Sequence, residues 1–162
     1  MAFFPSQKPT RPVLRSNAVF GVLDKDTGAL TDATSFSLLA ESSVADLNHR
    51  LEKEVSALTF RPNFVVHGTA APYEEEQWDW IRIGETVFQN VRPCTRCLLT
   101  TVDPETGTNY KNGQPLKELK SYKQITEEKL KPFAGESPVL GIHLGLRKPG
   151  TVKIGDPVYV PF

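Results

Sequence analysis

Two cysteines, Cys94 and Cys97, stand three residues apart, with Arg92 and Arg96 close beside them. They are the only cysteines of the chain, and the apolar, β-branched run Leu98–Val102 follows them. The thiolate is the reactive and metal-binding form of cysteine, and neighbouring cations stabilise it. This stretch is therefore the one place where the sequence proposes thiol or metal chemistry.

The spacing of Cys94 and Cys97 by itself leaves several interpretations open. A zinc site would need two further ligands, and the three histidines are scattered along the chain. A thioredoxin-like dithiol should open a helix, whereas Cys97–Val102 favours a strand. The remaining alternative is a pair of buried cysteines that only pack.

The composition is that of an ordinary globular domain. The chain has 162 residues, of which 39% are hydrophobic and 23% charged, enough for one domain with a sizeable core. The formal net charge is zero, so the basic excess that non-specific nucleic-acid binding requires is missing. No apolar run approaches the roughly 20 residues that span a bilayer, and the N-terminus lacks a secretory signal pattern. A cytoplasmic protein with no membrane segment and no nucleic-acid partner is the default expectation.

Thirteen prolines and eleven glycines, spread through the chain, favour many short strands and turns over a helix bundle. We expect an extended, poorly ordered lead-in over residues 1–16 and a single domain over residues 17–162. Strands are predicted at residues 17–23, 36–40, 64–68 and 139–146.

Two helices and two hairpins complete the expected elements. Ser43 and Asp46 match a capping box, and apolar residues then recur at helical spacing as far as Leu58. A shorter helix is expected over residues 116–122, and the acidic run 74–76 is expected to be solvated. Hairpins are predicted at residues 80–88 and 152–160, each with a glycine in the turn, and they suggest a curled, barrel-like sheet.

The run from Arg92 to Gly107 resembles the signature of MOSC domains, a family named from the C-terminal domain of molybdenum-cofactor sulfurase. It is most similar to the branch that contains the mitochondrial amidoxime-reducing component. Further similarity lies, in the family's order, in residues 42–51, 60–63, 119–122 and 149–159, so that the resemblance covers most of residues 30–160.

This resemblance implies a mainly β (α+β) fold, with a MOSC-type, barrel-like sheet and a few flanking helices. It also implies that the chain binds the molybdenum cofactor, which is molybdopterin carrying Mo. The metal ligand would be the second cysteine of the motif, Cys97, and a soft thiolate suits such a metal. Cys94 is then expected to have a packing role.

The resemblance implies further contacts to the cofactor. Arg61 and Arg96 would hold its phosphate and pterin oxygens, because a guanidinium group can bind phosphate through two parallel hydrogen bonds. Asn63 can offer both a donor and an acceptor to the pterin edge. Thr95 lies inside the motif and would contribute its hydroxyl or its backbone.

Thr34 and Ser35 align with a pair of cofactor-contacting residues, although the three residues from Ser37 depart from the family pattern. Asp103, before Pro104, is expected to form a turn rather than to carry protons.

The implied activity is the reduction of N-hydroxylated compounds such as amidoximes by a molybdenum-dependent oxidoreductase. Electrons would come from a cytochrome b5-like haem protein or a flavin reductase. Two alternatives stay open. Cys97 could carry a persulfide received from a pyridoxal-phosphate-dependent desulfurase, as a sulfur-carrier module, or the domain could be non-catalytic.

Relatives with reductase activity carry a preceding β-rich domain that closes part of the cofactor pocket. Because only a proline-rich lead precedes residue 17 here, we expect either a fragment or a lone module that binds the cofactor weakly or not at all. Mitochondrial association would require an upstream anchor of the kind that eukaryotic relatives have.

Overall fold

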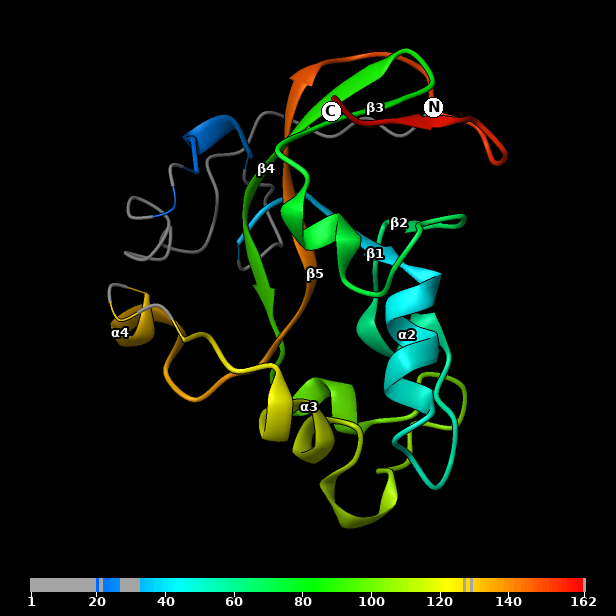
Figure 1. Ribbon diagram of the computed structural model, residues 1–162, viewed down its shortest axis with the longest axis vertical. Helices are drawn as coiled ribbons and strands as arrows, with labels where there is room; N and C mark the ends of the chain where they lie inside the picture. The colour runs from blue at the N-terminus through cyan, green and yellow to red at the C-terminus, as the bar shows by residue number, and fades with distance from the viewer. Residues whose placement is uncertain (1–19, 21, 27–32, 127, 129, 162) are drawn as a thin grey trace. The chain divides into compact units, whose positions relative to one another are not determined.

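The computed structural model describes residues 20, 22–26, 33–126, 128 and 130–161 (Figure 1). Six strands of this part form one sheet in the order β2-β1-β5-β4-β3-β6. β1 runs parallel to β2, and β3 is antiparallel to β4 and to β6. Their bounds are β1 Phe36–Ala40, β2 Phe64–Val66, β3 Trp80–Ile83, β4 Thr86–Thr95, β5 Val139–Lys148 and β6 Val158–Tyr159.

Short helices flank the sheet, which confirms the mainly β fold expected from the sequence. The α-helices are α2 Glu41–Asn48, α3 Leu116–Tyr122 and α4 Lys131–Ala134. The 3₁₀ helices are η1 Asp24–Asp26, η2 Ala57–Phe60, η3 Glu74–Gln77, η4 Leu98–Thr101 and η5 Lys111–Gly113. None of the helices in the described ranges is both long and apolar enough to cross a bilayer.

The chain forms two compact units. Of the described residues, the first unit takes those up to Phe36, together with Asp79–Arg92 and those from His143 onward. The second unit consists of Ser37–Trp78 and Pro93–Ile142. The long strands β4 and β5 each contribute residues to both units. The single domain over residues 17–162 stays a prediction.

The second unit has a core of apolar side chains from α2, α3, β1, β5, η2 and the chain before η2. Burying a side chain of this size stabilises a fold by roughly 1.5–3 kcal/mol. Its buried members are Leu39, Val44, Leu47, Val55, Phe60, Leu119 and Leu140.

The first unit contains the β3–β4 hairpin, which confirms the prediction for residues 80–88. Ile81 and Ile83 are buried while Trp80 and Arg82 are exposed, the alternation typical of a strand with one covered face. The turn glycine, Gly84, has a φ of +54°.

The second predicted hairpin, over residues 152–160, is wrong. Only Val158–Tyr159 forms a strand, and it pairs with β3 instead of with residues 152–154. The backbone N–H of Lys153 donates to the carboxylate of Asp156 at 2.7 Å, which closes a turn there. A Cβ at Gly84 would collide with this same carboxylate and with the Thr151 carbonyl oxygen. A local turn and a long-range pairing together replace the hairpin.

The predicted long helix is also wrong, because α2 ends at Asn48. The side chain of Asn48 binds both the N–H and the carbonyl of Val55 at 3.0 Å, which closes the following residues into a loop. Val55 still reaches the core, but from that loop. Asp46 and Arg50, four residues apart, form an ion pair at 3.2 Å.

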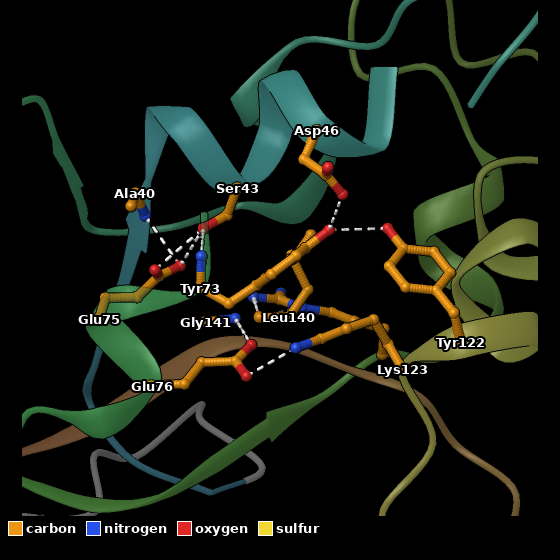
Figure 2. Close-up of polar contacts among 11 residues, drawn as sticks. Ala40, Ser43, Asp46, Tyr73, Glu75, Glu76, Tyr122, Lys123, Leu140 and Gly141 are labelled. Carbon is orange, nitrogen blue, oxygen red and sulfur yellow. Dashed lines mark hydrogen bonds and ion pairs between the residues drawn. The ribbon is translucent and has the colours of Figure 1, made fainter. Parts of the chain in front are cut away.

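The expected capping box is wrong as well, because Ala40 precedes the first residue of α2 and Ser43 points into the interior. Ser43 points inward because it binds a residue of the acidic run, which was expected to be solvated. Glu75 is fully buried and accepts hydrogen bonds from the Ser43 hydroxyl at 2.8 and 2.9 Å and from the Ala40 N–H at 3.1 Å (Figure 2). The run therefore fastens η3 to the start of α2.

Glu76, the next residue, belongs to the same network. Its carboxylate pairs with Lys123 at 2.7 Å and accepts the N–H of Gly141 in β5 at 3.3 Å (Figure 2). Burial raises the pKa of Glu76 above its ordinary value, and the Lys123 ammonium offsets part of that rise.

The predicted strand over residues 17–23 and the lead-in over residues 1–16 lie almost entirely outside the described residues.

Candidate functional site

The two cysteines face different environments at the end of β4. Cys94 is buried within the strand, whereas Cys97 follows its end and is exposed. The strand expected over Cys97–Val102 is wrong, because η4 begins there. The N–H of Thr100 binds the Cys97 carbonyl at 3.1 Å and the Thr100 hydroxyl binds it at 2.8 Å. One thiol is therefore available to a ligand, and it sits at the start of a hydrogen-bonded turn.

The expected strand after Cys97 was one reason against a dithiol, and that reason no longer holds. The burial of Cys94 now provides a different one, since only Cys97 is accessible in the folded chain.

Arg61 approaches the segment after Cys97 from another part of the second unit. It follows η2 with φ 50° and ψ 47°, the left-handed region that residues other than glycine rarely adopt. Its Nη1 donates to the carbonyl of Leu99 at 3.3 Å and to that of Thr59 at 3.5 Å. A left-handed residue of this kind costs on the order of 1 kcal/mol or more, and such residues cluster at functional sites.

Arg96 is buried, and its guanidinium binds main-chain carbonyls. Nη1 donates to Phe60 at 2.8 Å, and Nε donates to Leu140 at 2.9 Å, where Nη2 also binds. The charge of Arg96 is thus directed to the interior while Cys97 is exposed. Adjacency in sequence does not by itself bring this cation to the thiol.

Asn63 and Thr95 lie in the same unit. The side-chain oxygen of Asn63 accepts the N–H of Ser37 at 2.8 Å, and the N–H of Asn63 donates to the Ser37 carbonyl at 3.0 Å. Asn63 therefore ties the start of β2 to β1. Thr95 is the last residue of β4 and is half-buried.

Thr34 and Ser35 belong to the first unit, not to the unit that holds Cys97. The hydroxyl of Thr34 donates to the Phe36 carbonyl at 2.8 Å and lies 3.0 Å from Nδ1 of His143. The N–H of Ser35 donates to the Asp26 carbonyl at 2.8 Å.

Sequence reasoning missed the ion pair of Asp26, the residue whose carbonyl accepts the N–H of Ser35. The Asp26 side chain is fully buried and pairs with Arg147 at 2.5 and 3.0 Å. Because 121 residues separate the two partners, no local pattern could reveal the pair.

The donor set suits a metal that brings most of its own ligands. Within the described ranges, no group of three or more His, Cys, Asp or Glu side chains could hold a metal ion. Asp103 is occupied as the sequence predicts, with its carboxylate accepting the N–H of Glu105 at 2.9 Å in a turn. One exposed thiol, with the exposed Arg61 guanidinium bound to the carbonyl of Leu99 two residues later, fits the cofactor that the family resemblance implies, in which a dithiolene supplies other sulfur ligands and a phosphate needs a cation.

The model of the MOSC domain family matches residues 25–159, so this chain belongs to the MOSC domain family. The mainly β, MOSC-type fold expected from the sequence is thereby confirmed. Mitochondrial amidoxime-reducing component 1 of Homo sapiens is 44% identical to the chain over 158 residues, which are 98% of this chain and 45% of that protein. The Mus musculus protein of the same name is 42% identical, with the same two coverages.

Mitochondrial amidoxime reducing component 2 of Bos taurus is 43% identical over 145 residues, 89% of this chain and 42% of that protein. The chain thus spans less than half the length of these relatives. A crystal structure of YiiM from Geobacillus stearothermophilus aligns with a TM-score of 0.49 at 15% identity, covering 79% of this chain and 54% of that one.

Proposed function

We propose that this chain is the MOSC domain of a molybdenum-dependent reductase of N-hydroxylated compounds and that Cys97 is the protein ligand of the metal. The observation that carries the proposal is the exposure of Cys97 at the end of β4, beside a buried Cys94. A single accessible thiol in the motif supports one metal–thiolate bond rather than a dithiol. The relatives named as amidoxime-reducing components support the reaction class.

The chain's own residues would hold and orient the cofactor. Cys97 would supply its thiolate, and the exposed Arg61 guanidinium would neutralise a phosphate or pterin oxygen. Asn63 and Thr95 would add polar contacts from the same unit. The bound cofactor supplies the redox chemistry, while the protein supplies binding, orientation and electrostatics.

The partner and the location follow from the same proposal. A cytochrome b5-like protein or a flavin reductase would deliver the electrons. Residence at mitochondria is proposed from the names of the relatives, which are mitochondrial components.

A sulfur-carrier role is the second candidate, because an exposed thiol at Cys97 could equally accept a persulfide from a pyridoxal-phosphate-dependent desulfurase. Mass spectrometry after incubation with the desulfurase and cysteine separates the two. No added sulfur on Cys97 would reject the carrier role.

The decisive experiment measures molybdenum per chain after expression in a host that makes the cofactor. We expect bound metal in the wild type, at least a tenfold loss in Cys97→Ala and retention in the matched control Cys94→Ala. If Cys97→Ala retains as much molybdenum as the wild type, the ligand assignment is wrong. If the metal is bound but an artificial electron donor drives no amidoxime reduction, the reductase part of the proposal is rejected for this chain.

A further inference from the structure

We propose that Arg96 is a positioning residue, which sets Arg61 through the carbonyl of Phe60 and thereby fixes the turn that follows Cys97. The inference rests on the proposed function only for what Arg61 and Cys97 bind. It replaces the expectation that the Arg96 side chain itself holds the cofactor.

The surroundings of Arg96 leave it little freedom to bind a ligand. Its side chain is buried, and no carboxylate among the described residues forms an ion pair with it. A buried guanidinium stays charged and needs acceptors. The carbonyls of Phe60 and Leu140 provide them from two different segments. The planar fork of an arginine can reach both, whereas the single ammonium of a lysine cannot replace it.

The bond to Phe60 controls the backbone of Arg61. The carbonyl of Phe60 and the N–H of Arg61 belong to one planar peptide unit. Arg96 binds the carbonyl at 2.8 Å, and the Leu58 carbonyl accepts the N–H at 3.0 Å. Both ends of the peptide plane are therefore fixed, which explains how Arg61 is held in the left-handed conformation despite its cost.

Arg61 in turn reaches the turn after Cys97. The first two side chains of that turn are exposed, Leu98 by 76% and Leu99 by 52%, and only Thr100 is buried. The Arg61 guanidinium binds the Leu99 carbonyl at 3.3 Å and so tethers η4 to η2. These contacts connect the buried Arg96, through Phe60 and Arg61, to Leu99, which is two residues after Cys97.

Hydrogen exchange of the cofactor-free protein tests this path. The N–H groups of Thr100 and Val102 bond to the carbonyls of Cys97 and Leu99 and report on the turn at η4. The N–H of His49, bonded to Ala45 in α2, reports on general stability. We expect Arg96→Lys to accelerate exchange at Thr100 and Val102 by about fivefold, as for the loss of one ordinary hydrogen bond, without a matching change at His49.

Arg61→Gly is the partner variant, because glycine adopts the left-handed backbone freely and only the side-chain tether is lost. It should give the same acceleration, and the double variant should add nothing, since the two residues act in series. Arg96→Met replaces Arg96→Lys in the cycle if the lysine variant does not fold. The matched control is Gln124→Ala, which removes a side-chain bond to the Glu136 carbonyl elsewhere in the unit and should leave exchange at Thr100 and Val102 unchanged relative to His49.

Multiplying effects in the double variant, or no effect of Arg96→Lys where Arg61→Gly has one, would overturn the proposal. The molybdenum content of the same variants separates this result from the proposed function. Serial coupling in a protein that binds no molybdenum rejects the function and keeps the positioning role. Bound molybdenum without serial coupling rejects the positioning role of Arg96 and keeps the proposed function.

Discussion

The buried carboxylate of Glu75 accepts the hydroxyl of Ser43 at both of its oxygens, at 2.8 and 2.9 Å (Figure 2). Glu75, from the acidic run in η3, thus binds the first turn of α2 in the interior of the second unit. The same hydroxyl accepts the N–H of Tyr73 at 2.8 Å, so Ser43 contacts the start of η3 at both Tyr73 and Glu75.

We expect Glu75→Ala to lower the free energy of unfolding by about 3 kcal/mol. The substitution leaves the buried N–H of Ala40 without its acceptor and removes the acceptor of the Ser43 hydroxyl. Glu75→Gln keeps one acceptor oxygen and should cost less. Urea denaturation measures both changes. Glu105→Ala, at an exposed glutamate, is the control and should change stability by under about 0.5 kcal/mol. A loss at Glu75 no larger than this would show that its contacts contribute little.

The raised pKa of Glu76 should make the stability of the fold depend on pH. Burial raises the pKa of Glu76 in the folded state above its ordinary value of 4.5, with Lys123 offsetting part of the rise. The folded state therefore binds this proton more tightly than the unfolded state does. The stability from this group is fully present below pH 4.5 and is lost as the pH rises through the folded pKa.

The free energy of unfolding of wild type minus that of Glu76→Gln should accordingly decrease as the pH rises above about 4.5. Urea titrations at several pH values measure this difference. A difference that stays flat or increases with pH would contradict the prediction.

The hydrogen bond from Tyr73 to Asp46 should make stability depend on pH with the opposite sign. Its hydroxyl donates to Asp46 at 2.7 Å and lies 2.9 Å from the hydroxyl of Tyr122 (Figure 2). The bond from Tyr73 is the main cause that lowers the pKa of Asp46 in the folded state. The resulting stability is present above the unfolded pKa and is lost as the pH falls through the folded pKa.

Tyr73→Phe should therefore cost about 1–2 kcal/mol near neutral pH and less in acid. Thermal or urea unfolding at both pH values measures the loss. An equal loss at the two pH values would show that Asp46 does not gain from the hydroxyl.

We expect the stability effects of substitutions at Asp26 and Arg147 to be strongly coupled, because the two side chains form an ion pair in the first unit. Asp26 is fully buried and accepts two hydrogen bonds from Arg147. Asp26→Ala alone should cost about 3–5 kcal/mol, because it leaves an unpaired charge next to a buried site. The double variant Asp26→Leu with Arg147→Met removes both charges and should lose less than the two single losses combined. Additive losses would exclude the coupling.

Several elements followed from local sequence alone. Alternating apolar residues predicted β3, because a strand with one covered face imposes a period of two. Glycine in the turn predicted the β3–β4 hairpin. The motif around Cys97 predicted the MOSC family, because its residues lie close together in sequence.

Other features could not be predicted, because their causes lie far away in the chain. The helix predicted as far as Leu58 ends at Asn48, where an amide side chain closes a loop onto Val55. Helical spacing records only that apolar residues reach the core, and a loop can bring them there as well. The acidic run looked solvated because its partners, Ser43 and Lys123, are remote in sequence.

The sequence by itself determined the family and which of its residues could do chemistry, since residue types and short spacings are local properties. The tertiary structure alone decided how those residues are used. It buried Cys94 and exposed Cys97, and it turned Arg96 onto the carbonyls of Phe60 and Leu140. The physical reason is that burial and hydrogen-bond partners are set by segments that meet only after folding, so two adjacent residues, Arg96 and Cys97, end in opposite environments.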